Sequence, residues 1–221
     1  ILVGAGAGPR RRVRSLRRLL RRALFGAAAA AVAIAATLGL YLTPPLIHAL
    51  LGLSGAPALL GVEPRVAEEL SDALVGDLLT GGSFDVPYGG GPLLSAGERA
   101  HLVDVGGLLR GTIGAGLVGL ILLAVVGLRR RGWGRAAVRD GATLLALGAA
   151  AAAAAFALAF DATFAIFHGL FFAAGTWTFN PATDRLVQLY PERFWILVAL
   201  LFCLTLSTIA LIAYRLARRS R

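Results

Sequence analysis

Two histidines, His101 and His168, are the residues of this chain best suited to chemistry. The stretch FAIFHGLFFAAGTWTF, residues 164–179, places His168 among six aromatic residues. His101 begins the stretch HLVDV, three residues before Asp104, so on a helix the imidazole and the carboxylate share one face. An imidazole has a pKa of about 6.5 and can both accept and donate a proton near neutral pH. The pair is therefore a candidate for general acid–base catalysis.

Other roles for histidine remain open at this point. An interfacial imidazole can simply hydrogen-bond to lipid headgroups, which is the interpretation that we favour for the third histidine, His48. A bis-histidine haem or quinone protein would need its histidines to face each other across spans. The H-E-x-x-H spacing of a zinc enzyme is absent, and a lone Cys203 supports neither a cysteine-based metal site nor a disulfide. We therefore predict no metal and no cofactor.

The elements that must position these side chains follow from the composition. The chain has 221 residues, 57% of them hydrophobic, and a mean hydropathy of +0.76, which is typical of an integral membrane protein. A membrane-spanning helix needs roughly 20 apolar residues. Four runs qualify, at residues 23–42, 108–128, 142–160 and 195–214. The Ala-rich third run is suited to close contact with other helices.

The arginines predict how the four spans are oriented. Seventeen of the 22 arginines lie in a basic arm (1–22), a loop (129–141) and a tail (215–221), which a four-span topology places on one side. Positively charged loops stay in the cytoplasm, so both termini are expected there. The net charge of +10 is thereby assigned to topology and anionic lipid headgroups, and we predict no nucleic-acid binding.

The two remaining segments, 43–107 and 161–194, are expected to form an extracytoplasmic cap. In the first, RVAEELSDALVGDLLTGG repeats apolar residues at helical spacing, at Val66, Leu70, Leu74 and Leu78. VPYGGGP is interpreted as a flexible connector. Ser95 and Glu98 form a capping box that predicts a helix from about residue 96, leading into the second span.

The second outer segment is predicted to contain a helix that is too short to cross the membrane. Its aromatic stripe comprises Phe160, Phe164, Phe167 and Phe171, with His168 beside it, and the helix at residues 162–175 is expected to be interfacial or re-entrant. TWTFNPATDRLVQLY is predicted to form two short strands around an Asn-Pro turn that Asp184 closes. The predicted fold is an all-α integral membrane protein with four transmembrane helices, a cap of short helices and a small β-hairpin.

Two blocks of this sequence resemble the lipoprotein intramolecular transacylase (Lit) family. The first block is HLVDV at residues 101–105, and the second spans residues 164–195. The second block matches the family pattern at Phe164, Phe167, His168, Phe171, Phe172, Gly175, Trp177, Phe179, Pro181, Asp184, Leu186, Pro191, Phe194 and Trp195. The family often has a basic residue directly after H-x-x-D-V, where this chain has Gly106. We expect Arg110, one turn further on, to replace it.

The resemblance implies an acyltransferase of the bacterial plasma membrane that acts at the outer leaflet. Its substrate is a lipoprotein with a diacylglyceryl group on its N-terminal cysteine. The enzyme moves the sn-2 acyl chain to the α-amino group of that cysteine and gives a lyso-form lipoprotein. The alternative is a non-catalytic membrane scaffold or partner protein.

The hypothesis assigns a role to each candidate residue. His168 accepts the amine proton and returns it to the leaving oxygen, while His101 binds the ester carbonyl or shares the relay. Asp104 or Asp184 fixes an imidazole tautomer. The substrate-binding residues are expected to be Arg110, Asp184, Trp177, Phe164 and Phe171, the aromatic ones contacting acyl chains and excluding water.

Overall fold

The structure is a computed structural model that describes residues 9–129 and 134–219. Residues 1–8 of the predicted basic arm, 130–133 of the predicted loop and 220–221 of the predicted tail lie outside these ranges. Within them, four helices are long and apolar enough to cross a membrane. They are α1 (Pro9–Tyr41), α5 (Ala96–Arg129), α6 (Gly134–Leu158) and α9 (Glu192–Arg219). The prediction of an all-α membrane protein with four spans is confirmed.

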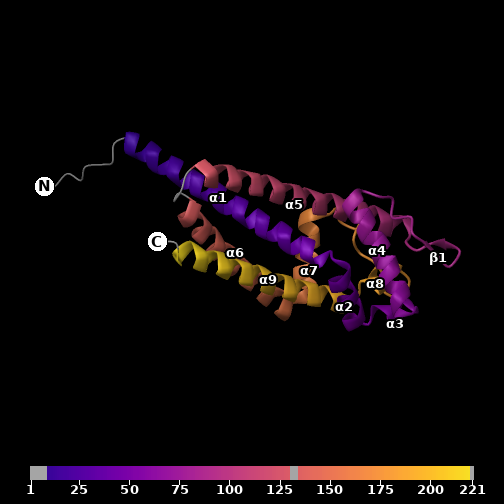
Figure 1. Cartoon of the computed structure of the whole chain (residues 1–221). Helices are drawn as coiled ribbons and strands as arrows, with labels where there is room; N and C mark the ends of the chain where they lie inside the picture. Colours follow the sequence, from indigo (N-terminus) through magenta and orange to yellow (C-terminus); the bar gives the residue numbers. More distant parts are fainter. Residues whose placement is uncertain (1–8, 130–133, 220–221) are drawn as a thin grey trace.

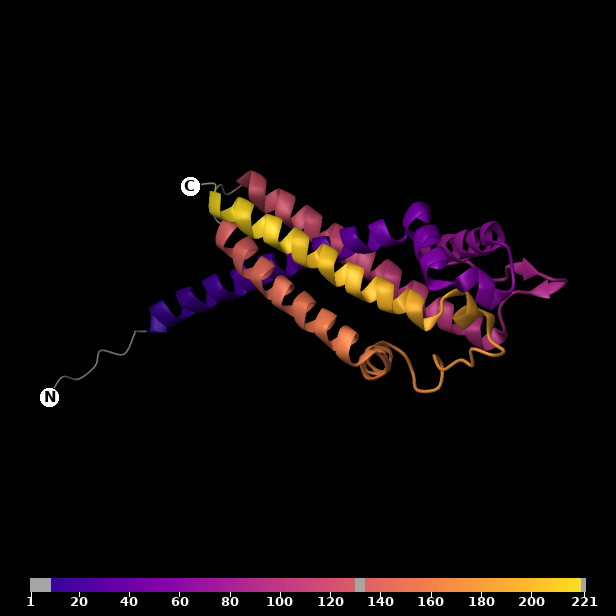
Figure 2. The ribbon, with the colours of Figure 1, turned by 90° about the horizontal axis from the view of Figure 1, so that it is seen from below.

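Helix α1 is the centre of the bundle. It packs against α5 on one side and against α6 and α9 on the other, whereas α5 makes little contact with α6. Figure 2 shows α6 and α9 side by side, with the N-terminal part of α1 diverging from them. Small residues allow the close approach: a Cβ at Gly119 would lie 2.7 Å from the Ala28 carbonyl oxygen, and one at Gly141 2.8 Å from the Gly26 Cα.

Little of the spanning helices is covered by protein. Only 11–22% of the residues in their most apolar windows are buried. A small cluster of Ala33, Ala149, Cys203 and Leu206 joins α1, α6 and α9. The remaining apolar surface faces outward, and lipid is the solvent that can cover it.

The short elements gather at the end of the bundle opposite the two chain termini (Figure 1). They are α2 (Pro44–Ser54), α3 (Ala56–Leu60), α4 (Pro64–Thr80), β1 (Pro87–Tyr88), β2 (Gly91–Pro92), α7 (Phe160–Phe171) and α8 (Arg185–Leu189). We call this end the cap. Glycine in the left-handed conformation ends α4 at Gly81, with φ of 81°, as the sequence GG predicts.

The main hydrophobic core of the described residues lies in the cap and not between the spans. Side chains that are almost fully buried come from α2, α3, α4, α8 and the loops between them: Leu50, Leu51, Leu60, Leu74, Phe84, Leu94 and Leu189. Leu70 and Leu74 of the predicted α4 face are buried here, beside Ser71, whose hydroxyl meets the Tyr190 hydroxyl at 2.8 Å. The cap therefore packs in the manner of a water-soluble domain.

The β-hairpin lies at a different place from the one predicted. The predicted connector VPYGGGP forms it, with Pro87 paired to Pro92 and Tyr88 to Gly91. Gly89 and Gly90 both have positive φ, 59° and 88°, which a two-residue hairpin turn of this type requires. The segment that we expected to be a flexible connector is therefore an ordered turn between two short strands.

The strands predicted within TWTFNPATDRLVQLY are wrong. The Asn-Pro turn itself forms as predicted, and Asp184 closes it: Asp184 Oδ2 accepts from the Asn180 amide at 2.6 Å, and Asn180 Oδ1 accepts from the Ala182 amide at 3.0 Å. Such bonds compete with a strand ladder. The following residues form α8, which buries Leu186 and Leu189 at helical spacing.

Helix α7 begins directly after α6 and has 12 residues. The chain bends at Ala159, whose φ of −151° and ψ of 64° are not helical. Twelve residues at about 1.5 Å each cannot cross a hydrocarbon layer of about 30 Å. The short helix was predicted, with its limits two residues too late at the start and four too late at the end.

Candidate active site

The two histidines that the sequence singled out lie next to each other. His101 comes from the N-terminal part of α5 and His168 from the last turn of α7. Their ring centroids are 6.0 Å apart and the ring planes are inclined by 28°. Both side chains are buried, with 7% and 9% of their surface exposed. Two elements that are distant in the sequence thus bring two proton-transfer groups together.

A backbone hydrogen bond fixes the tautomer of His168. Its Nδ1 lies 2.8 Å from the carbonyl oxygen of Phe164, one turn earlier in α7. A carbonyl oxygen only accepts, so Nδ1 carries the hydrogen and donates it. In the neutral ring the lone pair then belongs to Nε2. No hydrogen bond from the described residues occupies this nitrogen, which leaves it available as a base.

Burial keeps His168 neutral. Desolvation lowers the pKa of His168 below its ordinary value of 6.5, and the bond to the Phe164 carbonyl opposes this in part. The unprotonated ring therefore predominates at neutral pH. That is the state that a general base needs before it takes a proton.

Aromatic rings surround the imidazole pair. The ring centroids nearest to that of His168 belong to Phe164 at 3.8 Å and Trp177 at 4.9 Å. Phe172 lies against both imidazoles, and Phe179 lies 5.6 Å from His101. We call Phe164, Phe167, Phe172, Trp177 and Phe179 the aromatic cluster. Sequence reasoning treated Phe172 and Phe179 only as matches to the family pattern and did not place them at the site.

Two polar atoms in this cluster have no partner. His101 Nδ1 and Trp177 Nε1 are buried and form no hydrogen bond within the described parts of the chain. Most buried polar atoms in proteins are paired, because an unpaired one costs about 1–3 kcal/mol. A polar group of a substrate that reached either atom would supply the missing partner.

Glu98 joins the segments that carry the site and was not predicted to do so. Its side chain is 2% exposed, and Oε1 accepts from the Leu186 amide at 2.7 Å. Oε2 accepts from the Ser95 amide at 2.7 Å, and the Ser95 hydroxyl accepts from the Glu98 amide at 3.3 Å, as the capping box predicts. One carboxylate thus holds the start of α5 and the start of α8 together.

Neither of the two aspartates forms a hydrogen bond to an imidazole. Asp104 is exposed, and no described hydrogen bond joins it to either ring. Asp184 bonds to the Asn180 amide and to the Thr183 hydroxyl, at 2.6 and 3.1 Å. For His168, the group that fixes the tautomer is the Phe164 carbonyl. Its role was missed because a main-chain acceptor has no residue signature.

Arg110 lies over Gly106 and reaches the end of α4. Its Nη1 donates to the Leu78 carbonyl oxygen at 2.8 Å. A Cβ built at Gly106 would lie 2.8 Å from the same nitrogen, so the glycine leaves the space that the guanidinium fills. Arg110 therefore occupies the space that a side chain at residue 106 would take.

The predicted stripe of phenylalanines divides into two. Phe160, Phe164 and His168 follow one another at four-residue spacing, so His168 belongs to the stripe itself. Phe171 packs on Phe167 instead, with 5.0 Å between the ring centroids, and is 51% exposed. Phe171 therefore lies outside the cluster that encloses the imidazoles.

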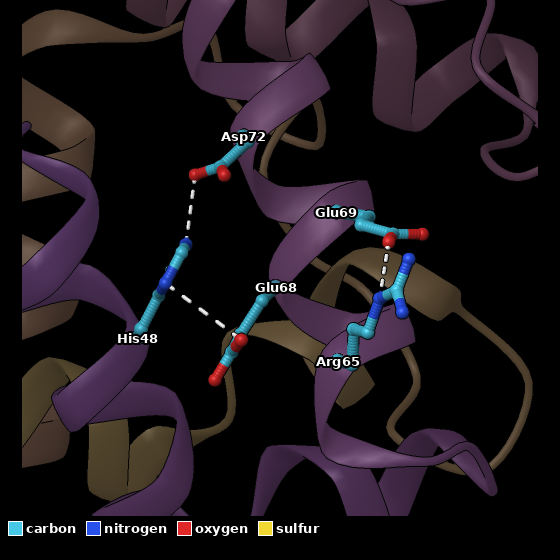
Figure 3. Close-up of polar contacts among 5 residues, drawn as sticks. All are labelled: His48, Arg65, Glu68, Glu69 and Asp72. Carbon is cyan, nitrogen blue, oxygen red and sulfur yellow. Dashed lines mark hydrogen bonds and ion pairs between the residues drawn. The ribbon is translucent and has the colours of Figure 1, made fainter.

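His48 lies in a separate polar group that links α2 to α4 (Figure 3). Its Nε2 lies 2.9 Å from Asp72 Oδ1, and its Nδ1 lies 3.8 Å from Glu68 Oε2. Arg65 and Glu69 pair with each other on α4. No group of three or more histidine, cysteine, aspartate or glutamate side chains in the described ranges is arranged to hold a metal ion. The contacts of His48 are those of a tie between two cap helices.

Comparisons with known proteins show which family and which fold this chain resembles. A family model described as lipoprotein intramolecular transacylase Lit matches residues 83–195, slightly more than half of the chain. Among solved structures, the membrane integral lipoprotein intramolecular transacylase Lit from Bacillus cereus is similar, with a TM-score of 0.70 and 22% identity over 92% of this chain and 95% of that one. A variant of it with one histidine replaced by arginine gives 0.67 and 20%, covering 96% of each chain. No curated protein matches the sequence significantly.

Proposed function

Since the chain belongs to the lipoprotein intramolecular transacylase (Lit) family, we propose that it moves the sn-2 acyl chain of a diacylglyceryl lipoprotein to the α-amino group of the N-terminal cysteine. The observation that carries this proposal is the buried imidazole pair, with the lone pair of His168 on a free Nε2. Its substrates are lipid-modified proteins held in the membrane.

The reaction is the aminolysis of an ester. The α-amine attacks the carbonyl carbon of the sn-2 ester and passes a proton to His168 Nε2. A C–N bond forms, and the carbonyl electron pair moves onto oxygen. When that pair returns, the bond from carbon to the glycerol oxygen breaks, and the protonated His168 gives its proton to the leaving oxygen. The proton that the amine loses is the one that the glycerol hydroxyl gains.

The surroundings of His168 can stabilise the positive charge that its imidazole carries while it holds the proton. The Phe164 carbonyl bond and the faces of Phe164 and Trp177 favour the imidazolium once it forms. His101 lies 6.0 Å away, and a second positive charge there would be unfavourable. We assign to His101 the role of a neutral hydrogen-bonding partner for the ester carbonyl, or of a second member of the relay.

Water must be excluded for acyl transfer to exceed hydrolysis. Phe164 and Trp177 cover the imidazole that acts as the base, and the exposed Phe171 extends the apolar surface of α7 toward acyl chains. Because acyl donor and amine belong to one substrate, their proximity gives an effective concentration that a second molecule could not reach. No covalent acyl-enzyme is needed.

Three polar residues have supporting roles in the proposal. Arg110 uses one N–H for the Leu78 carbonyl, and a guanidinium has five, so the others can hold glyceryl or peptide oxygens. Asp104 follows His101 by three residues on α5 and places an exposed negative charge on the same face of the helix. Asp184 shapes the loop that carries Trp177 and Phe179.

The positive-inside pattern supports a cytoplasmic location for both termini and an outer location for the cap. The site then lies at the level of the outer leaflet, where the lipid anchor of a secreted lipoprotein is held. Membrane lipid and diacylglyceryl-modified lipoproteins are accordingly the expected partners.

Expression in a bacterium that makes only diacylated lipoproteins tests the proposal. Mass spectrometry of lipoprotein N-termini should detect N-acyl, S-monoacylglyceryl cysteine with the wild-type protein and with His48→Ala, a histidine variant outside the site. His168→Ala should leave the diacylglyceryl form unchanged, and His101→Ala should reduce conversion strongly. Wild-type protein that is present in the membrane and leaves all N-termini diacylated would refute the proposed reaction.

A further inference from the structure

The indole N–H of Trp177 has no partner, although it is buried. Nε1 forms no hydrogen bond within the described residues, and an indole nitrogen can only donate. The ring packs 4.9 Å from His168 and 6.4 Å from Phe164, measured between centroids. Folding has thus left a donor without an acceptor directly beside the imidazole base.

The site offers few groups that could stabilise a negative oxygen. In the aromatic cluster and the imidazole pair, only Trp177, His101 and His168 carry polar side-chain atoms. The Nδ1 hydrogen of His168 is taken by the Phe164 carbonyl, and its Nε2 must accept a proton. Arg110 donates one N–H to the Leu78 carbonyl, and its other N–H groups are assigned above to glyceryl or peptide oxygens rather than to the reacting carbonyl. Trp177 remains as a donor, and its indole nitrogen keeps its hydrogen at every pH of interest.

We propose that Trp177 is a catalytic residue whose Nε1–H donates to the oxygen of the reacting ester carbonyl and stabilises the tetrahedral oxyanion. This inference rests on the proposed acyl transfer and names the group that receives the developing negative charge. A preorganised N–H in a site without water acts more strongly on an oxyanion than on a neutral carbonyl. Its contribution therefore belongs to the transition state and not to substrate binding.

Kinetics of the purified protein with a synthetic diacylglyceryl lipopeptide test this role. Trp177→Phe removes the N–H, and 3-benzothienylalanine at position 177 removes it while keeping the size of the indole. In both, kcat should fall by roughly 100- to 1,000-fold, as for loss of one oxyanion donor. KM should change by less than about threefold. Trp195→Phe, at the start of α9, is the matched control and should keep wild-type kinetics.

A binding measurement separates this inference from the reaction itself. In protein with 15N-labelled tryptophan, the indole resonance that is missing from Trp177→Phe belongs to Trp177. A lipopeptide analogue with an anionic phosphonate in place of the sn-2 ester should move this resonance downfield. An ester-free ether analogue should not.

The outcomes are distinct. Wild-type kcat in both Trp177 variants, or a raised KM with unchanged kcat, would overturn the catalytic role. If the wild type transfers no acyl chain, the proposed function fails, and the phosphonate experiment alone then decides whether Nε1–H is an oxyanion donor. An unmoved resonance with bound phosphonate would refute that as well.

Discussion

At the scale of single residues, the site depends on two nitrogens of one imidazole having different neighbours. Nδ1 of His168 faces a main-chain carbonyl, and Nε2 forms no hydrogen bond with the described residues. Few other hydrogen-bond donors lie in the imidazole pair and the aromatic cluster, so one role can be assigned to each polar atom. A backbone acceptor in this role also means that no single substitution removes the tautomer constraint without changing α7.

The pKa of His168 gives a prediction at this scale. Burial lowers that pKa, so on acidification the ring should take its proton below pH 6.5, later than a free histidine. Since the unfolded chain then binds the proton more readily, the free energy of unfolding should fall as pH drops below 6.5 toward the folded-state pKa. An NMR titration with 13C-labelled histidine, assigned by His48→Ala and His101→Ala, measures the pKa directly. A midpoint at or above 6.5 for His168 would contradict this account.

A direct titration is preferable to a rate profile here. The α-amine of the substrate has a pKa of about 8 and must also be unprotonated to attack. The acid limb of kcat/KM will therefore contain the amine as well as His168.

At the scale of the elements, Glu98 determines how the segments of the site are joined. It is the carboxylate through which the helix of His101 holds α8, and the loop with Trp177 and Phe179 lies between α7 and α8. Glu98→Ala should leave the buried Leu186 amide and the partly buried Ser95 amide unpaired, at about 1–3 kcal/mol for the buried one. We expect a lower melting temperature in detergent and a fall in kcat.

Glu98→Gln keeps an acceptor oxygen, so its melting temperature and its kcat should fall less than those of Glu98→Ala. The control is Glu192→Ala, which changes an exposed glutamate in the first turn of α9 and should have little effect. If Glu98→Ala melts and turns over like the wild type, the carboxylate is not what aligns these segments.

The contact between α1 and α5 gives another prediction at this scale. A side chain at Gly119 would meet the Ala28 backbone, which cannot move aside as a flexible side chain can. Gly119→Leu should therefore destabilise the protein by about 1–3 kcal/mol, as overpacking does. A Cβ at Gly111 on the same helix would meet nothing within 4 Å, so Gly111→Leu is the control. Thermal unfolding in detergent compares the two, and equal melting temperatures would argue against close packing there.

Some features of these elements could be predicted from the sequence, and others could not. The capping box at Ser95 and Glu98 and the amphipathic pattern of α4 are local, and both were read correctly. The hairpin was misplaced because short apolar stretches around Asn-Pro fit a strand as well as a turn followed by α8. The bond from Glu98 to the Leu186 amide joins residues 88 positions apart, so no local pattern announces it.

The imidazole pair was predictable for a different reason. Topology placed both outer segments on one side of the membrane and both histidines at one depth. Their ring separation and the Phe164 bond depend on the bend at Ala159 and the packing of the cap, which spacing alone does not specify.

At the scale of the whole molecule, the protein combines a water-type core in its cap with spans whose apolar surface is mostly not buried by protein. The Arg-rich ends lie at the opposite end from the cap (Figure 1). This polarity predicts which surface reaches the medium. A Cys introduced at Ser83 in the cap should react with a membrane-impermeant maleimide in intact cells, and one at Arg215 only after permeabilisation.

Unsubstituted protein supplies the background for this labelling, because the native Cys203 is buried. Labelling of the Arg215→Cys protein in intact cells, with the Ser83→Cys protein silent, would reverse the orientation and remove the site from the outer leaflet.

The two imidazoles belong to segments whose spanning helices, α5 and α6, make little contact with each other. His101 is rigidly continuous with α5, whereas His168 follows α6 through the bend at Ala159, and α1 separates most of the two spans. A thinner or thicker bilayer tilts such helices independently to match its hydrophobic width. We therefore expect the spacing of the imidazole pair to change with membrane thickness, and turnover to depend on the acyl-chain length of the host lipids even when the substrate is unchanged.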